Sequence, residues 1–173
     1  MINKFLIYII FVVNLSFFAN ASTEIPFPNM FVSKVPITYK EEIEFKGFEG
    51  KLINLSSYNN EIFLLNFWAT WCAPCKKEMP SLNKLQSNFK EIKIFPINIQ
   101  ESDKKKPEIF FKNLKINNLQ IYFDTNSKLA NIFWLRGIPT TILLNKEGDE
   151  FARIIGEIDF YDKKFVEWLN QFI

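Results

Sequence analysis

Two cysteines, Cys72 and Cys75, lie between two different hydrophobic patterns, and this arrangement limits the possible folds more than any other feature of the chain. The run Ile62–Phe67 before them is short and almost wholly apolar, which is typical of a strand buried on both faces of a sheet. The apolar residues after them recur every three or four positions, the pattern of one face of a helix. These residues are Cys75, Met79, Leu82, Leu85 and Phe89. The sequence therefore predicts a strand, a turn and a helix, with the cysteine pair at the turn.

A Cys-x-x-Cys pair is commonly half of a zinc site, a haem attachment site or a redox pair. The 173 residues contain two cysteines and no histidine, so one chain lacks the ligands of a zinc or iron–sulfur site, and we expect no metal. Haem attachment needs a histidine after the second cysteine, where this chain has Lys76. A purely structural disulfide remains an alternative, although so small a loop stabilises little. The pattern favours a redox-active disulfide between Cys72 and Cys75, with no further cofactor.

The position of each cysteine predicts its role. Cys72 is expected at the helix N-terminus, where unpaired N–H groups and the helix dipole favour a thiolate over a thiol. It is therefore predicted to be the exposed nucleophile that forms mixed disulfides. Cys75, one turn later on the apolar face, is predicted to be the buried resolving thiol, and Pro74 presets the backbone for the start of the helix. Trp71, beside the nucleophile, is interpreted as a contact surface for partners, with a plain surface aromatic as the alternative.

Alternating strand and helix patterns extend through the rest of the chain. The predicted strands are Ile37–Phe48 (a strand or hairpin), Ile62–Phe67, Ile92–Ile99, Gln120–Phe123, Thr140–Leu144 and Phe151–Ile155. Besides the helix after Cys72, helices are predicted over Pro107–Leu114 and Asn126–Trp134, and from an N-cap at Asp159 to the C-terminus. Pro80 inside the first helix predicts a kink. These elements predict an α/β fold with a central mixed sheet flanked by helices.

The first 21 residues have the features of a secretion signal. Lys4 is followed by the apolar run Phe5–Val13, and Ala19-Asn20-Ala21 supplies the small-x-small pattern before Ser22. The alternative is an uncleaved membrane anchor, although the apolar run is shorter than a spanning helix needs. We therefore expect a signal peptide at 1–21, an extended lead-in at 22–36 and one domain at 37–173. The domain is predicted to be periplasmic or otherwise extracytoplasmic, and to be held at a membrane only if the N-terminal segment stays uncleaved.

Charge excludes one large class of partners. The formal net charge is +2, and the longest run of one sign is Lys104-Lys105-Lys106, which is interpreted as a solvated loop or helix start. No broad basic face is available to neutralise many phosphates, so nucleic-acid binding is not expected.

The residues around the cysteines resemble those of a known family. The segment Asn66–Pro80 reads NFWATWCAPCKKEMP, and Gly137–Thr141 reads GIPTT. Together they are similar to the TlpA/ResA-type extracytoplasmic thioredoxins, from about Ile37 to the C-terminus. The resemblance implies a thioredoxin-like fold with an N-terminal strand or hairpin extension, and dithiol/disulfide exchange with protein partners. It further implies reduction of disulfides in apocytochromes c or copper-site assembly proteins, with a membrane-bound electron donor for re-reduction.

The same resemblance assigns roles to single positions. Pro139 matches a cis-proline that packs opposite the cysteines and leaves the backbone of Ile138 free to pair with a substrate strand. Glu78 matches a carboxylate that tunes the thiols, with a first-turn acid favoured by the helix dipole as the alternative. Asn66 falls where cytoplasmic thioredoxins carry a buried aspartate, so an ionisable group is absent at that position.

Two other functions remain open at this stage. The direction of electron flow depends on both redox couples, so the protein could instead oxidise or isomerise the thiols of secreted proteins. A Cu(I)-binding thiol module is a third possibility, because soft thiolates suit Cu(I), but no histidine or methionine cluster supports it.

Overall fold

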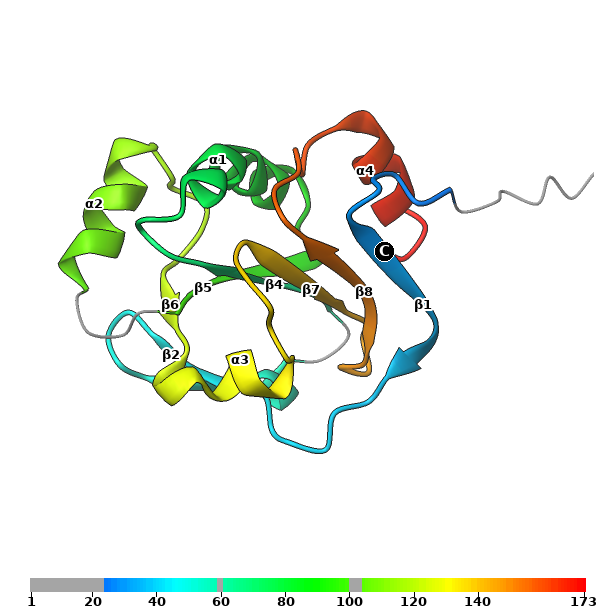
Figure 1. Cartoon of the computed structure of the whole chain (residues 1–173), viewed down its shortest axis with the longest axis horizontal. Coiled ribbons are helices and arrows are strands. Elements are labelled where there is room, and N and C mark those ends of the chain that lie inside the picture. The colour runs from blue at the N-terminus through cyan, green and yellow to red at the C-terminus, as the bar shows by residue number, and fades with distance from the viewer. Residues whose placement is uncertain (1–23, 59–60, 100–103) are drawn as a thin grey trace, which may run out of the picture.

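The computed structural model describes residues 24–58, 61–99 and 104–173, and the expected signal peptide at 1–21 lies outside these residues. The strands are β1 Met30–Ile37, β2 Glu44–Gly47, β3 Leu52–Asn54, β4 Ile62–Trp68, β5 Ile92–Asn98, β6 Tyr122–Phe123, β7 Thr140–Leu144 and β8 Glu150–Ile155. The helices are α1 Ala73–Asn88, α2 Lys105–Asn113, α3 Lys128–Ile132 and α4 Lys163–Leu169. Two short 3₁₀ turns, η1 Leu55–Ser57 and η2 Thr125–Ser127, complete the described elements (Figure 1).

The described strands form one mixed sheet in the order β1-β8-β7-β4-β5-β6-β2-β3. Strand β4 lies near its centre, parallel to β5 and antiparallel to β7. Segments from the N-terminal part of the chain occupy both edges, because β1 pairs with β8 at one end while the β2–β3 hairpin extends the other. The strand that carries the cysteine motif is therefore held in the interior of the sheet.

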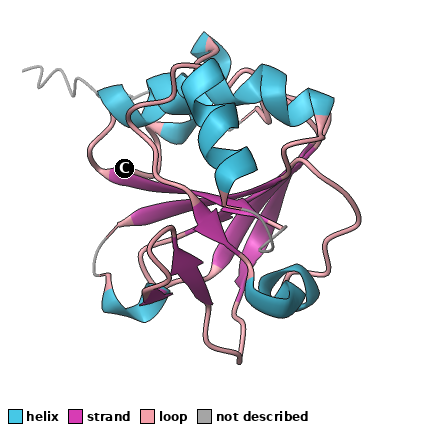
Figure 2. Cartoon of the chain, turned by 90° about the vertical axis from the view of Figure 1, so that its left-hand side faces the viewer, coloured by secondary structure: helices cyan, strands magenta, loops and turns pink. Residues whose placement is uncertain are grey.

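Alternation along β4 divides the hydrophobic core into two layers. Ile62, Leu64 and Trp68 pack with the buried side chains of α1, α2 and α4 on one face. Phe63, Leu65 and Phe67 pack on the other face with residues from η1 and α3. Figure 2 shows the longer helices above the sheet and the two short ones below it. Every residue of β4 is buried, as its apolar run predicts.

The buried carboxylate of Glu150 and the partly buried guanidinium of Arg153, both on β8, connect this strand to the segment before β2. Arg153 donates from Nε to Oε1 of Glu150 at 2.8 Å, and the Tyr39 hydroxyl donates to the other carboxylate oxygen. Burial, followed by the hydrogen bond to Glu150 and then the negative charge of Glu150, raises the pKa of Tyr39. The guanidinium also donates from Nη1 to the carbonyl oxygen of Phe133 at 2.9 Å, which links this cluster to the chain just after α3.

The mixed α/β fold is confirmed, and two details differ from the sequence predictions. The segment 22–36 contains most of β1, which pairs antiparallel with β8. Pro36 within this strand is tolerated because β1 is at the edge of the sheet. The predicted N-cap at Asp159 is wrong: α4 begins at Lys163, and Asp162 caps it by accepting from the N–H of Lys164. Asp159 instead accepts from the N–H of Tyr161, in the turn before the helix.

Candidate active site

The disulfide between Cys72 and Cys75 lies where β4 gives way to α1. Cys72 is the N-cap residue of α1, and its Sγ accepts a hydrogen bond from the N–H of Cys75 at 3.2 Å. Pro74 occupies the first turn of the helix, where a backbone N–H would have no hydrogen-bond partner within the helix, so the lack of an N–H in proline costs nothing. An N–H aimed at a sulfur is the arrangement that stabilises a thiolate once the disulfide is reduced.

The two sulfurs differ in access, but less than the sequence predicts. The expectation that Cys72 is an exposed thiol is wrong in degree, since 5% of the residue is accessible. Cys75 is completely buried at 0%. Cys72 remains the more accessible of the two, because the N-cap position is at the end of the helix while Cys75 faces the core.

Glu78 lies three residues after Cys75, on the same inner face of α1, and is 2% exposed. The Asn66 amide nitrogen donates to Glu78 Oε1 at 2.8 Å and to Thr141 Oγ1 at 2.9 Å. Asn66 and Thr141 are neighbours across β4 and β7, and both point toward α1. Glu78 begins the second turn of the helix, so its interpretation as a first-turn dipole acid is wrong.

Burial gives Glu78 unusual acid–base properties. Desolvation raises the pKa of its carboxyl group to about 8, against the lowering effect of the hydrogen bonds from Asn66 and the backbone of Ile158. Glu78 can therefore hold or release a proton near neutral pH. The sequence places no ionisable group at Asn66, and the structure supplies one beside it from α1.

A small pocket of about 490 Å³ gives Glu78 a route toward solvent. Pro80, Ser81 and Ile158 are among its lining residues, and an ion pair of 3.0 Å between Lys77 and Glu157 lies at the same place. The pocket joins α1 to the segment after β8, so water can approach the carboxyl group from the side of the helix.

The segment before β7 faces the cysteine motif across the end of the sheet. Thr140, the first residue of β7, pairs with Phe67 near the end of β4. The Ile138–Pro139 peptide bond is cis, as expected, while the role of Pro139 in recognition stays a prediction. The carbonyl oxygen of Pro139 accepts from the N–H of Gly156 at 2.8 Å. Among the described residues, no hydrogen bond involves the backbone of Ile138.

Trp71 is 65% exposed next to Cys72, and no ring contact or hydrogen bond occupies its indole within the described residues. The structure thus brings Trp71, Cys72, Cys75, Glu78, Ile138 and Pro139 to one end of the sheet. The sequence analysis does not predict the bond from Asn66 to Glu78. The alternation of β4 could have indicated it, because it places Asn66 on the same face as α1.

The described residues contain no group of three or more His, Cys, Asp or Glu side chains that could hold a metal ion. Within the same residues, no helix has both the length and the apolar character needed to cross a membrane.

A mixed sheet flanked by helices, with a Cys-x-x-Cys disulfide at the start of the helix after a central strand, defines a thioredoxin-like domain. The chain belongs to the AhpC/TSA family, whose model matches residues 39–149. Thiol-disulfide oxidoreductase ResA of Bacillus anthracis is 36% identical over 115 residues, which make up 63% of this chain and 63% of ResA. ResA of Bacillus subtilis is 37% identical over 109 residues, covering 62% and 60% of the two chains. The resemblance to ResA-type proteins is thereby confirmed.

Solved structures agree with the fold. StoA from Bacillus subtilis is 28% identical, with a TM-score of 0.62 over 79% of this chain and 99% of StoA. A secreted thiol-disulfide isomerase from Corynebacterium glutamicum has a TM-score of 0.69 at 20% identity, over 82% and 88% of the two chains. The chain spans somewhat less than two thirds of the length of the ResA relatives it matches.

Proposed function

We propose that this protein is an extracytoplasmic thiol:disulfide oxidoreductase that reduces disulfides in partner proteins. The observation that carries the proposal is the Cys72–Cys75 disulfide at the N-terminus of α1, with the buried acid Glu78 one turn beyond it. The name of the ResA relatives, thiol-disulfide oxidoreductase, supports the same class of reaction.

The reaction proceeds by two exchanges. The Cys72 thiolate attacks one sulfur of a partner disulfide, forming a Cys72–partner disulfide and releasing the other partner sulfur as a thiolate. The Cys75 thiolate then attacks the Cys72 sulfur, which restores the Cys72–Cys75 disulfide and releases the second partner thiolate. Two electrons pass from the protein's dithiol to the partner, whose two thiolates each take up a proton. A reduced dithiol of a donor protein, which the resemblance implies is membrane-bound, regenerates the dithiol by the reverse exchange.

Glu78 serves this cycle as the proton carrier for Cys75. A buried thiol must lose its proton before it can attack, and Cys75 is fully buried. Glu78 shares its helix face, and with a pKa near 8 its carboxylate can accept that proton and release it through the adjoining pocket. The bond from Asn66 keeps the carboxyl group in place.

Trp71 and the Ile138–Pro139 segment form the docking edge for the partner. The backbone of Ile138 has no bond to other described residues, so an extended partner segment can pair with it. Main-chain pairing tolerates many partner sequences, which suits disulfides in apocytochromes c or copper-site assembly proteins.

The location proposed for the protein is the periplasm or another extracytoplasmic compartment, reached through a signal peptide at 1–21. The structural relatives include a secreted isomerase and a pneumococcal exposed lipoprotein thioredoxin. Mass spectrometry of the protein from its native host is expected to find Ser22 as the first residue. An intact Met1 in the membrane fraction would establish an anchor instead.

A trapping experiment tests the roles of the two cysteines. Cys75→Ser is expected to accumulate mixed disulfides between Cys72 and partner proteins, because the resolving thiol is absent. Cys72→Ser is the matched control and is expected to trap none. Trapping by Cys72→Ser alone would show that the two roles are reversed.

The direction of electron flow is tested by the reduction potential of the Cys72–Cys75 couple. A reductase is expected to have a value near that of thioredoxin, about −270 mV, whereas a strong oxidant such as DsbA lies near −120 mV. A value at the oxidising end would assign the protein to thiol oxidation.

A further inference from the structure

Trp134, between α3 and β7, has two features that its surroundings do not explain. Its side chain is 71% exposed, and within the described residues its indole has neither a ring contact nor a hydrogen bond. Its backbone has a φ of 48°, in the left-handed region that bulky residues avoid. A large exposed aromatic in a conformation that disfavours it indicates a role outside the stability of the fold.

The backbone at Trp134 follows the standard end of a helix. The N–H of Trp134 donates to the carbonyl oxygen of Asn131 at 3.1 Å, and the N–H of Leu135 donates to that of Ala130 at 2.9 Å. These are the two bonds of a Schellman motif, in which the residue at the position of Trp134 is usually glycine. Glycine would therefore fit this backbone better than tryptophan does.

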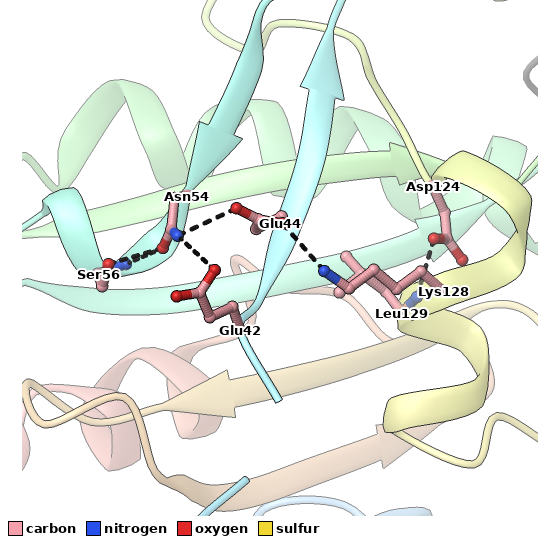
Figure 3. Close-up of polar contacts among 7 residues, drawn as sticks. All are labelled: Glu42, Glu44, Asn54, Ser56, Asp124, Lys128 and Leu129. Atoms are coloured by element: carbon pink, nitrogen blue, oxygen red, sulfur yellow. Dashed lines mark hydrogen bonds and ion pairs between the residues drawn. The ribbon is translucent and has the colours of Figure 1, made fainter. Parts of the chain in front are cut away.

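Both ends of α3 are fixed, so the indole of Trp134 is held on a rigid support. At the start, the carboxylate oxygens of Asp124 each accept a backbone N–H at 2.9 Å, one from Leu129 and one from Ala130, and Lys128 pairs with Glu44 at 3.0 Å. Figure 3 shows Lys128 reaching Glu44 of β2, and the backbone N–H of Leu129 bonded to Asp124. At the other end, Arg153 donates to the carbonyl oxygen of Phe133, the residue before Trp134.

The position of Trp134 places it near the docking edge. Figure 1 shows the chain leaving α3 and rising to the start of β7, beside β4. Trp134 precedes Ile138 by four residues, a span of at most about 14 Å even when fully extended. Trp71 and Trp134 are thus exposed indoles on the segment that follows β4 and on the segment that precedes its partner strand β7.

The positive charges near Trp71 and Trp134 indicate which charge a partner segment should carry. Residues 69–77 and 133–140 contain three cations and no acid. Lys77 is paired with Glu157, while Lys76 and Arg136 are exposed and have no ion pair among the described residues. A partner segment that is apolar and carries acidic residues complements this surface, because it covers the indoles and offsets the positive charge.

We propose that Trp134 is a specificity-determining residue. Its indole contacts an apolar side chain that lies next to the disulfide of the partner protein, in an extended segment that also carries acidic residues. This proposal rests on the proposed thiol:disulfide exchange and adds the chemical class of its substrate. Exposed tryptophans at interfaces commonly contribute a large part of the binding energy, because they bury much apolar surface at little cost in rotamer entropy.

The test uses two peptides, each a disulfide-linked homodimer containing one cysteine. Both carry the same glutamates, and they differ in having leucine or serine on each side of the cysteine. The reduced protein is mixed with each peptide at concentrations that do not saturate it, and kcat/KM is obtained as the second-order rate constant for release of peptide thiol in this single turnover. We expect the wild-type protein to prefer the leucine peptide, and Trp134→Gly to lower kcat/KM for that peptide by about 5- to 10-fold, against less than about twofold for the serine peptide.

Thermal unfolding separates docking from a structural role. Trp134→Gly is expected to raise Tm, since glycine suits the left-handed backbone. Trp134→Phe is expected to retain most of the leucine preference. The matched control is Lys115→Gly: Lys115 has a φ of 56° and is at the same Schellman position after α2, with the N–H of Ile116 bonded to the carbonyl oxygen of Phe111 at 2.9 Å. It is expected to raise Tm in the same way and to leave both peptide rates as in the wild type.

The outcomes distinguish this inference from the function on which it rests. Equal rates for the two peptides with the wild-type protein would overturn the inference and leave the exchange activity standing. A lower Tm for Trp134→Gly, with equal losses on both peptides, would show that Trp134 is structural and would also overturn it. Failure of the wild-type protein to reduce either peptide or a small disulfide such as oxidised glutathione would overturn the proposed function itself.

Discussion

A carboxyl group on the inner face of a helix loses most of its hydration, and in Glu78 the hydrogen bond from Asn66 and the nearby backbone of Ile158 replace only part of it. Desolvation raises the pKa of Glu78 by more than the interactions with Asn66 and the Ile158 backbone lower it. The resulting pKa is about 8. The neutral acid is therefore the favoured form in the oxidised protein below about pH 8, and the carboxylate that accepts the Cys75 proton is the minority form at neutral pH.

This shift makes the stability of the protein depend on pH. Between the ordinary pKa of 4.5 and the folded value of about 8, the folded state keeps a proton on Glu78 that the unfolded state releases. The contribution of Glu78 to the free energy of unfolding is thus complete below about pH 4.5 and is lost as pH rises toward 8, by about 1.4 kcal/mol per unit at most. Above pH 8 the loss levels off.

Glu78→Gln removes this ionisation while keeping an oxygen that can accept from Asn66. The oxidised variant is expected to gain stability relative to the wild type as pH rises from 5 to 8, as measured by urea unfolding at each pH. Glu91→Gln, an exposed change beyond the other end of α1, is the control and is expected to have a small effect. A difference between Glu78→Gln and the wild type that stays constant over this range would contradict the assigned pKa.

For single residues, the Cys-x-x-Cys spacing predicts the disulfide but not how exposed its cysteines are or what surrounds them. The Cys-x-x-Cys motif locates the disulfide because both residues belong to one turn of chain. The exposure of Cys72 depends on what packs over the helix end, and the left-handed backbone of Trp134 depends on where α3 stops. Neither property is encoded within a short window, so both require the folded structure.

At the scale of single elements, α3 is short and depends on its anchors. Asp124 is 2% exposed and accepts two backbone N–H groups, whereas the Lys128–Glu44 pair is partly in solvent. Asp124→Ala is expected to lower the free energy of unfolding by about 2–4 kcal/mol, because two donors near the start of α3 lose their acceptor.

Lys128→Ala is the matched comparison for this cap. It is expected to cost less than about 1 kcal/mol, since exposed ion pairs contribute little. Urea unfolding of the two variants measures both values. Equal losses would show that the ion pair, and not the buried carboxylate, anchors α3.

Pattern strength explains which elements the sequence predicts. Strand β4 and helix α1 have long unambiguous periods, and both were predicted close to their observed bounds. The pairing of β1 was not predicted, because Pro36 and the nearby prolines weaken the strand pattern, and its partner β8 is more than a hundred residues away. The sequence does not locate the start of α4, because Asp159 and Asp162 are equally suitable N-cap residues by type. Asp162 caps the helix, whereas Asp159 accepts a hydrogen bond in the turn before it.

At the scale of the whole molecule, hydrophobic layers on both faces of the sheet hold the described fold together. The disulfide closes a loop of only a few residues, so it restricts the unfolded chain weakly. Reduction is expected to leave the domain folded and to change the free energy of unfolding by about 2 kcal/mol or less. Urea unfolding with and without dithiothreitol measures this change, with the Cys72→Ser/Cys75→Ser variant as control. Loss of cooperative unfolding on reduction would assign the disulfide a structural role.

The placement of β1 has a consequence for how the chain is made. Met30 pairs with Ile154, so β1, the first of the described strands, finds its partner only when β8, the last of them, has been made. Contacts between residues so distant in sequence form late, because they must first offset the entropy cost of closing the long loop between them. Strand β1 therefore stays without its sheet partner until β8 has been synthesised, and this edge of the sheet is completed after the interior strands have been made.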